Sequence, residues 1–234
     1  MKRVGIVQSN YIPWKGYFDL IGSVDEFIVY DDVQYTRRDW RNRNKILTPQ
    51  GLKWLTVPIA VKQHYSQYIR DIKIFDSDWA ISHWRTLYMN YKRSEFFDDI
   101  AVWLEPIYMQ YNYIFLSDLN FELIKKICEF LGIQTRITKS EWYDRCEGRL
   151  DNLVYLCKQA GGSVYVSGPS AKTYLDSSAF ESSGIKLSWF NYDSYPEYSQ
   201  LWGGEFVHQV SVLDLLFNCG KSSSTYMKFP LKHL

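Results

Sequence analysis

RVGIVQSNYIPWKGYFDLIGSVDEFIVYDD, residues 3–32, holds a complete strand–helix–strand pattern. Its first apolar run, Arg3–Gln8, is short and β-branched, which is typical of a buried strand. In residues 14–22 the apolar side chains recur at the spacing of one helical face, and a glycine ends the pattern. Residues 26–32 then form a second apolar run that stops at two aspartates. This order predicts a βαβ unit with two parallel strands side by side.

The rest of the chain continues the alternation of short apolar runs and amphipathic stretches. An Arg- and Asn-rich segment, residues 33–51, reads as a loop, and Ser117 and Gly132 are placed to cap the two ends of one helix. Further strands are expected at 54–59, 68–74, 135–139, 163–168 and 185–192, and helices at 79–93, 94–111, 117–132, 149–162, 174–184 and 210–220.

The apolar runs are continuous rather than alternating, which indicates a parallel sheet buried on both faces. No internal repeat and no strong change of composition divides the chain. The sequence therefore predicts a single α/β domain over residues 1–234. We expect it to be Rossmann-like, with a mainly parallel sheet flanked by helices and a helical insertion at about 76–131.

Composition limits the function classes. Apolar residues make up 46% of the 234 residues, so the chain can form a core and is not of the disordered class. A formal net charge of +1 offers no extended basic surface, so nucleic acid is not an expected partner. No apolar run is long enough to insert into a membrane, and no export signal or Cys-x-x-Cys pair occurs. We therefore expect a cytoplasmic protein, and the spacing of histidines and cysteines predicts no metal site.

Ligands of open α/β sheets bind beyond the carboxyl ends of the strands. That rule selects four segments: 8–16, 31–44, 167–174 and 191–200. All four are rich in polar and aromatic side chains, as a binding site would be. The candidate substrate-binding residues are Gln8, Asn10, Tyr11, Trp14, Gly16, Tyr17, Arg38, Trp40, Arg41, Asn42, Arg43, Ser167, Gly168, Tyr174 and Gln200.

Three residues are candidates for catalysis. Asp31 and Asp32 end the second strand, where paired acids could hold Mg²⁺ or a ribose hydroxyl, although a turn cap and a solvated carboxylate explain them equally well. His83 lies on a predicted helix, where a lone histidine is more often structural. Any of the three could act as a general base.

The densest basic segment of the chain is Arg37–Arg43, RRDWRNR. Four arginines in seven residues can make bidentate contacts to phosphates or carboxylates, while Trp40 can stack on a ring. The alternative is a solvated charged loop. At the first loop, Gly16 could let a ligand approach the start of the helix, whereas Pro13 and Trp14 could equally form a packed turn.

Several motifs together resemble the WbqC-like protein family. In chain order they are QSNYIPWKGYFDLI, FIVYDDVQYTRRDWRNRNKI, WLTVPI, a helix centred on His83 and Trp84, YVSG and VSVLDLLFNCG, and they cover about residues 4–220. The resemblance implies a role in the biosynthesis of O-antigen or other bacterial surface polysaccharides, with transfer of glycine to a sugar as a suggested activity. Ser9 and His208 replace prolines, and Cys219 replaces an acid, so His208 and Cys219 are discounted as catalytic residues.

The first βαβ unit also resembles, more weakly, that of nucleotidylyltransferases and pantothenate synthetase. Their His-x-Gly-His motif would fall on residues 14–17, where the glycine is kept and both histidines are missing. This resemblance favours a Rossmann-like sheet and argues against adenylyl transfer by the usual histidines.

The leading functional hypothesis is a surface-glycan enzyme that transfers an aminoacyl or acyl group to the amine of a nucleotide-activated sugar. Its partners would be a nucleotide sugar and an amino-acid or acyl donor, free or bound to a carrier protein, and the sequence assigns it no definite cofactor. One alternative is a nucleotidylyltransferase-like enzyme that activates an acid with ATP and Mg²⁺. The other is a non-catalytic binding or scaffold protein of glycan assembly.

Overall fold

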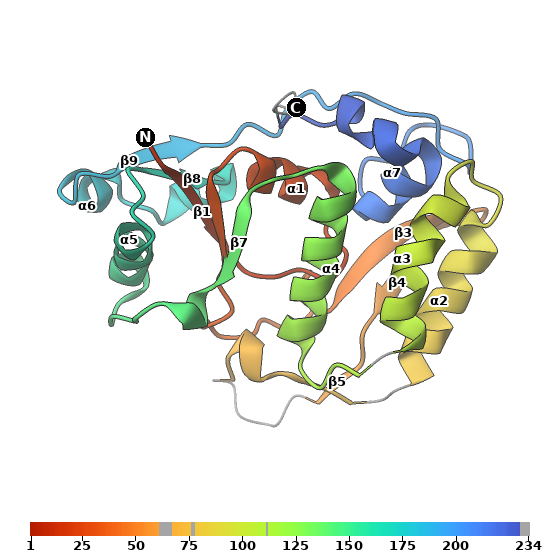
Figure 1. Cartoon of the computed structure of the whole chain (residues 1–234), viewed down its shortest axis with the longest axis horizontal. Helices are drawn as coiled ribbons and strands as arrows, with labels where there is room; N and C mark the ends of the chain where they lie inside the picture. The colour runs from red at the N-terminus through yellow and green to blue at the C-terminus, as the bar shows by residue number, and fades with distance from the viewer. Residues whose placement is uncertain (61–66, 76–77, 111, 230–234) are drawn as a thin grey trace.

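The computed structural model describes residues 1–60, 67–75, 78–110 and 112–229, and a five-stranded parallel sheet lies at its centre (Figure 1). The predicted α/β, Rossmann-like fold is confirmed. Across the sheet the strands are β7 (Arg136–Lys139), β2 (Glu26–Val29), β1 (Arg3–Val7), β8 (Val164–Ser167) and β9 (Lys186–Trp189).

The opening stretch of sequence forms the predicted βαβ unit. β1 pairs in parallel with β2, with Val4 opposite Glu26 and Val7 opposite Val29. Between them runs α1 (Lys15–Gly22), whose Phe18 is fully buried. Hydrophobic burial of this helix against the sheet, rather than helix propensity, stabilises such a short segment.

Both faces of the sheet are covered, which explains the continuous apolar strands. In β2, Phe27 packs into a large core with α1 and α4 (Leu116–Leu131), whereas Ile28 points to a second core with α5 (Arg149–Gln159) and α6 (Ser177–Glu181). Figure 1 shows α5 and α6 on one side of the sheet and α1 and α4 on the other.

The strand order contains one reversal. Along the chain, successive strands are added from β1 to β2 to β7 on one side, and the chain then crosses to β8 and β9 on the other side of β1. The segments that leave the carboxyl ends of β1 and β8 therefore diverge over opposite faces. Such a switch point between two neighbouring strands is where ligands bind in open α/β sheets.

A second layer of elements lies beyond α1 and α4 (Figure 1). It contains α2 (Asp78–Tyr91), α3 (Phe97–Met109) and α7 (Val212–Cys219), with a hairpin of β3 (Arg43–Thr48) and β4 (Gly51–Thr56). Two short strands, β5 (Ile59–Ala60) and β6 (Lys73–Ile74), pair nearby. Within the described residues, no helix has the length and apolarity needed to cross a bilayer.

Three local predictions were wrong. Residues 43–48 of the predicted loop 33–51 form β3, whose basic side chains suggested a loop but lie on the half-exposed face of a hairpin. Residues 69–71 of the strand predicted at 68–74 form a 3₁₀ turn, because Ile69 and Ile72 are both buried at a spacing of three. Ser117 does not cap α4, which begins one residue earlier; its hydroxyl donates to a carboxylate instead.

Gly132 ends α4 as predicted, with φ of 71° in the left-handed region. Since no atom lies within 4 Å of a Cβ built there, Gly132→Ala should cost only conformational strain. We expect the free energy of unfolding to fall by about 1 kcal/mol in urea denaturation. Gly203→Ala is the matched control, because that site is equally open and has no left-handed backbone, and an equal loss in both variants would contradict the explanation.

Candidate functional site

A cavity of about 1190 Å³ lies at the switch point, between the segments that follow β1 and β8. Nine of the candidate residues predicted from the sequence line it. They are Gln8, Asn10, Trp14, Tyr17, Asp32, Arg41, Ser167, Gly168 and Tyr174. The cavity is large enough for a ligand the size of a nucleotide sugar.

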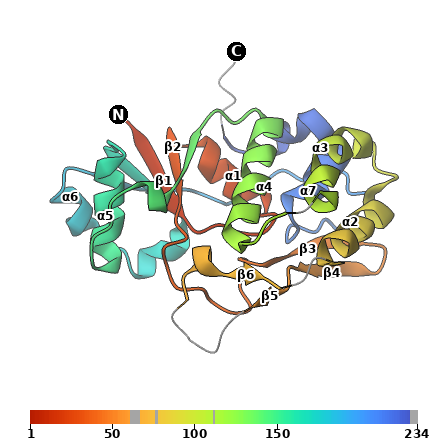
Figure 2. The ribbon, with the colours of Figure 1, turned by 60° about the horizontal axis from the view of Figure 1, so that its bottom comes forward.

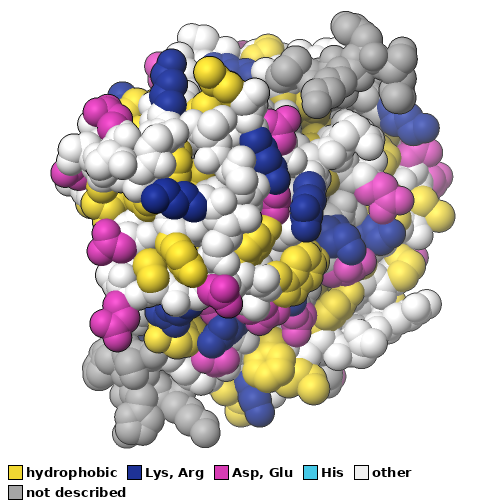
Figure 3. Space-filling model, turned by 60° about the vertical axis from the view of Figure 1, so that its left-hand side comes forward, with side chains coloured by type: hydrophobic (Ala, Val, Ile, Leu, Met, Phe, Trp, Pro, Cys, Tyr) yellow, Lys and Arg dark blue, Asp and Glu magenta, His cyan; other side chains and the backbone are white. Residues whose placement is uncertain are grey.

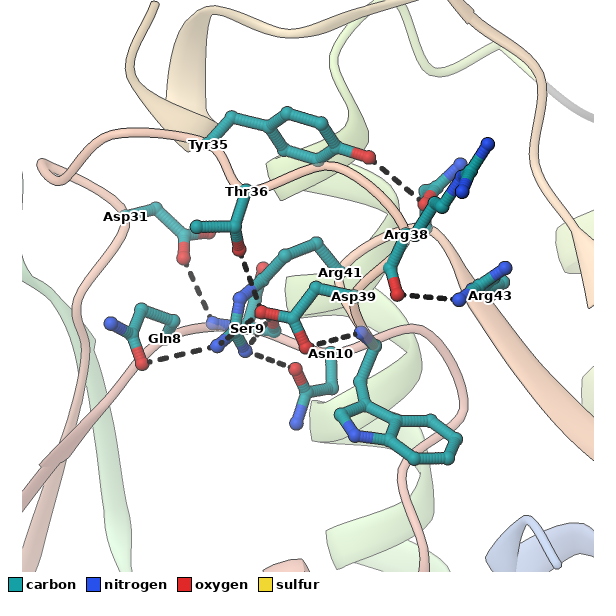
Figure 4. A network of polar contacts seen from close by, with 12 residues as sticks. Gln8, Ser9, Asn10, Asp31, Tyr35, Thr36, Arg38, Asp39, Arg41 and Arg43 are labelled. Atoms are coloured by element: carbon teal, nitrogen blue, oxygen red, sulfur yellow. Dashed lines mark hydrogen bonds and ion pairs between the residues drawn. The ribbon is translucent and has the colours of Figure 1, made fainter. Parts of the chain in front are cut away.

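Arg41 fixes the loop that follows β1 (Figure 4). Its guanidinium donates to the backbone carbonyl of Ser9 at 3.2 Å, to the side-chain oxygen of Gln8 at 3.3 Å and to that of Asn10. Asp39 lies 3.5 Å away as an ion-pair partner. Arg41 thus holds the amide side chains of Gln8 and Asn10 at the cavity wall. Its own hydrogen-bond donors are already bound to acceptors within the protein.

Asp31 belongs to the scaffold under the cavity. Its carboxylate accepts from the backbone N–H of Ser9 at 2.8 Å and from the hydroxyl of Ser117, and so connects β1, β2 and α4. Burial raises the pKa of Asp31, while these hydrogen bonds act in the opposite direction. Asn120 of α4 completes the support, with its amide donating to the Ser9 hydroxyl at 3.0 Å and to the Arg41 carbonyl at 2.9 Å.

Asp32 is the candidate acid that faces the cavity. Arg70 forms an ion pair with it. The 3₁₀ turn Ile69–Asp71 positions Arg70, because the Asp31 carbonyl accepts from the Arg70 N–H at 3.1 Å. The two aspartates therefore have separate partners and point to different surroundings, so the sequence pair is not a ready-made Mg²⁺ site.

His83 is buried in the second layer, outside the cavity lining. Its Nδ1 lies 2.8 Å from the hydroxyl of Tyr11, which in turn lies 2.6 Å from that of Tyr108. Burial lowers the pKa of His83 to about 4, so the ring is neutral at pH 7. The imidazole packs against the indole of Trp79, with 5.0 Å between ring centroids.

The remaining candidates also lie outside the cavity lining. Gly16 leaves room for the indole of Trp14, with which a Cβ would clash, rather than for a ligand. Asn42 is buried, where its side-chain oxygen accepts from the Tyr35 hydroxyl and its amide donates to the Val57 carbonyl. The side-chain amide of Gln200 donates to the Asp214 carboxylate at 2.8 Å. Three others, Arg38, Trp40 and Arg43, lie on or beside the β3–β4 hairpin.

The sequence interpretation missed two arginines of the cavity wall. Arg145 lies over the ring of Tyr68, 4.8 Å from its centroid, and Arg149 lies 4.3 Å from the centroid of Tyr174. Both follow β7, a strand that the sequence had predicted, so the strand-end rule applied to that strand would have found them. Together with Arg41 they give the cavity wall three arginines, against the two acids Asp32 and Glu147.

Aromatic rings supply much of the remaining wall. The seven are Trp14, Tyr17, Tyr30, Tyr68, Tyr165, Tyr174 and Tyr192. On the face that carries α5 and α6, basic, acidic and hydrophobic side chains are interspersed (Figure 3). Local contacts within the cavity, rather than a broad field of one charge, would therefore select a ligand. In the described ranges no three His, Cys, Asp or Glu side chains are grouped to hold a metal; His64 and His233 lie outside those ranges.

Residues 8–226, most of the chain, match the model of the WbqC-like protein family. The chain belongs to the WbqC-like protein family. The uncharacterized protein Rv1507c of Mycobacterium tuberculosis is 53% identical over 229 residues, which cover 98% of this chain and 99% of that relative. No solved structure matches the chain. The predicted WbqC-like resemblance is therefore confirmed.

Proposed function

We propose that this WbqC-like protein is a cytoplasmic enzyme of surface-glycan biosynthesis. It would transfer an aminoacyl or acyl group to the amine of a nucleotide-activated sugar bound in the switch-point cavity. One observation carries the proposal: the cavity joins basic side chains to aromatic rings at the place where α/β sheets bind nucleotides. Arginines suit the diphosphate, and the rings suit the base and the sugar.

The loop after β1 argues against the binding mode of dinucleotide enzymes. Residues 8–14 contain no glycine, and the indole of Trp14 fills the space beside Gly16 at the start of α1. A diphosphate would therefore be held by side chains from the opposite wall, where Arg145 and Arg149 lie. This arrangement favours the nucleotide sugar over the ATP-dependent alternative, which needs a Mg²⁺ site at Asp31 and Asp32.

Among the three candidate bases, Asp32 is the one that lines the cavity. In the proposed reaction the sugar amine attacks the carbonyl carbon of the activated acyl donor and forms an amide bond, while the bond between that carbon and the donor's carrier breaks. Asp32 accepts the proton that the amine loses and can return it to the departing carrier group. The ion pair with Arg70 would orient the carboxylate.

Binding of UDP-glucosamine, a nucleotide sugar with a free amine, measured by calorimetric titration, tests the proposal. We expect Arg149→Gln and Tyr174→Ala each to weaken binding about tenfold, because one removes a charged donor and the other a stacking ring. Arg85→Gln, an exposed arginine of α2, should bind like the unchanged protein.

The same titrations can also contradict the proposal. Absence of binding, or equal affinity in all variants, would contradict the proposed site. Mg²⁺-dependent binding of ATP that is lost in Asp32→Asn would instead support the acid-activating alternative.

A further inference from the structure

Two exposed tryptophans lie side by side at the β3–β4 hairpin, Trp54 within β4 and Trp40 just before β3. Trp40 is 44% exposed and Trp54 is 41% exposed, with ring centroids 5.5 Å apart and planes 31° apart. The tryptophans of α2 differ sharply, since Trp79 and Trp84 are each only 6% exposed. Contact between the two indoles therefore leaves large parts of both rings in water.

Register places cations on the same face as these rings. Lys45 is the cross-strand partner of Trp54, and its ammonium lies 5.0 Å from the ring centroid. The guanidinium of Arg43 lies 4.4 Å from the centroid of the same ring. Leu52, two residues before Trp54 in β4, is also exposed. We call Trp40, Arg43, Lys45 and Trp54 the hairpin platform.

The local charge is one-sided. From Trp40 to Val57 the chain has four basic residues and no acidic residue, although the net charge of the whole protein is only +1. The nearest acid in sequence, Asp39, forms an ion pair with Arg41. The hairpin platform therefore favours an anion that also presents apolar surface to the rings.

The hairpin platform is separate from the switch-point cavity. None of its four residues lines the cavity, although Trp40 immediately precedes Arg41, which does. Figure 2 shows the hairpin at the periphery of the molecule, beside α2 and far from α5 and α6. A ligand on the hairpin platform would thus leave the cavity open.

We propose that the hairpin platform binds an acidic oligosaccharide. The apolar C–H faces of pyranose rings pack on indole faces, and carboxylates of the sugar pair with Arg43 and Lys45. Single-stranded nucleic acid would stack similarly, but it needs a row of basic contacts along its backbone. The hairpin platform offers two cations at its rings, which suits a sugar with isolated charges. This inference does not depend on the reaction proposed for the cavity.

Titration with hexagalacturonate, followed through the indole N–H signals in NMR spectra, tests the inference. Trp40→Phe and Trp54→Phe assign the two signals. We expect both signals to shift on titration, while that of Trp142, which is 59% exposed elsewhere on the surface, stays in place. Trp54→Ala should weaken binding about tenfold, and the matched control Trp142→Ala should not change it.

Charge and ligand class are tested separately. Arg43→Gln should reduce the preference for hexagalacturonate over neutral cellohexaose, because Lys45 remains. The inference is overturned if hexagalacturonate leaves both signals unmoved, if Trp54→Ala binds it as well as the unchanged protein, or if a thymidine hexanucleotide binds the hairpin platform more tightly. Because these probes contain no nucleotide sugar, failure here is distinguishable from failure of the cavity proposal.

Discussion

Replacing Arg41 by alanine should lower the free energy of unfolding by about 3 kcal/mol. The side chain is 13% exposed, and its donors satisfy acceptors on Gln8, Ser9 and Asn10. Removing the guanidinium leaves these acceptors without their hydrogen-bond donor and Asp39 without its ion-pair partner. Denaturant unfolding followed by circular dichroism measures the loss.

Arg41→Lys separates charge from geometry. Lysine keeps the positive charge near Asp39, but its ammonium cannot reproduce the planar donor geometry by which the guanidinium donates to acceptors on three successive residues. We therefore expect Arg41→Lys to lose more than half of the stability that Arg41→Ala loses. The exposed Arg85→Ala is the control, with little expected change. Stability unaltered in Arg41→Ala, together with weaker binding of UDP-glucosamine, would show instead that Arg41 mainly contacts ligand.

The parts of the fold that sequence predicts well are those encoded locally. The apolar runs of β1 and β2, the helical spacing around Phe18 and the glycine after α4 each follow from short-range sterics and burial. β3 was missed because its solvent-facing residues are basic, and their stacking on Trp54 is visible only once the hairpin is formed.

The site is only partly encoded in this local way. The strand-end rule points to Gln8, Asp32 and Ser167 because parallel strands deliver their carboxyl ends to one edge. It cannot tell that Asp31 turns toward Ser117, 86 positions further along the chain, whereas Asp32 turns toward the cavity. Neighbouring residues at a strand end face opposite ways, and long-range packing decides which way is open.

The same long-range packing decides the role of His83, and a pH experiment measures it. Burial lowers the pKa of His83 to about 4, from an ordinary value of 6.5. Well above pH 6.5 the ring is neutral in both the folded and the unfolded chain, so it adds no pH dependence there. Between pH 6.5 and 4 the unfolded chain binds a proton that the folded protein does not, and stability falls as the pH falls.

Over this range the loss due to His83 should reach about 3 kcal/mol. The buried Asp31 and Asp214 have raised pKa values and act in the opposite direction, so the difference between variants is the informative quantity. We expect the decline in unfolding free energy between pH 7 and pH 4.5 to be smaller in His83→Gln than in the unchanged protein. His208→Gln, at an exposed histidine, should keep the decline. An identical decline in His83→Gln would mean that the imidazole takes up its proton in the folded state, which would return His83 to the list of candidate bases.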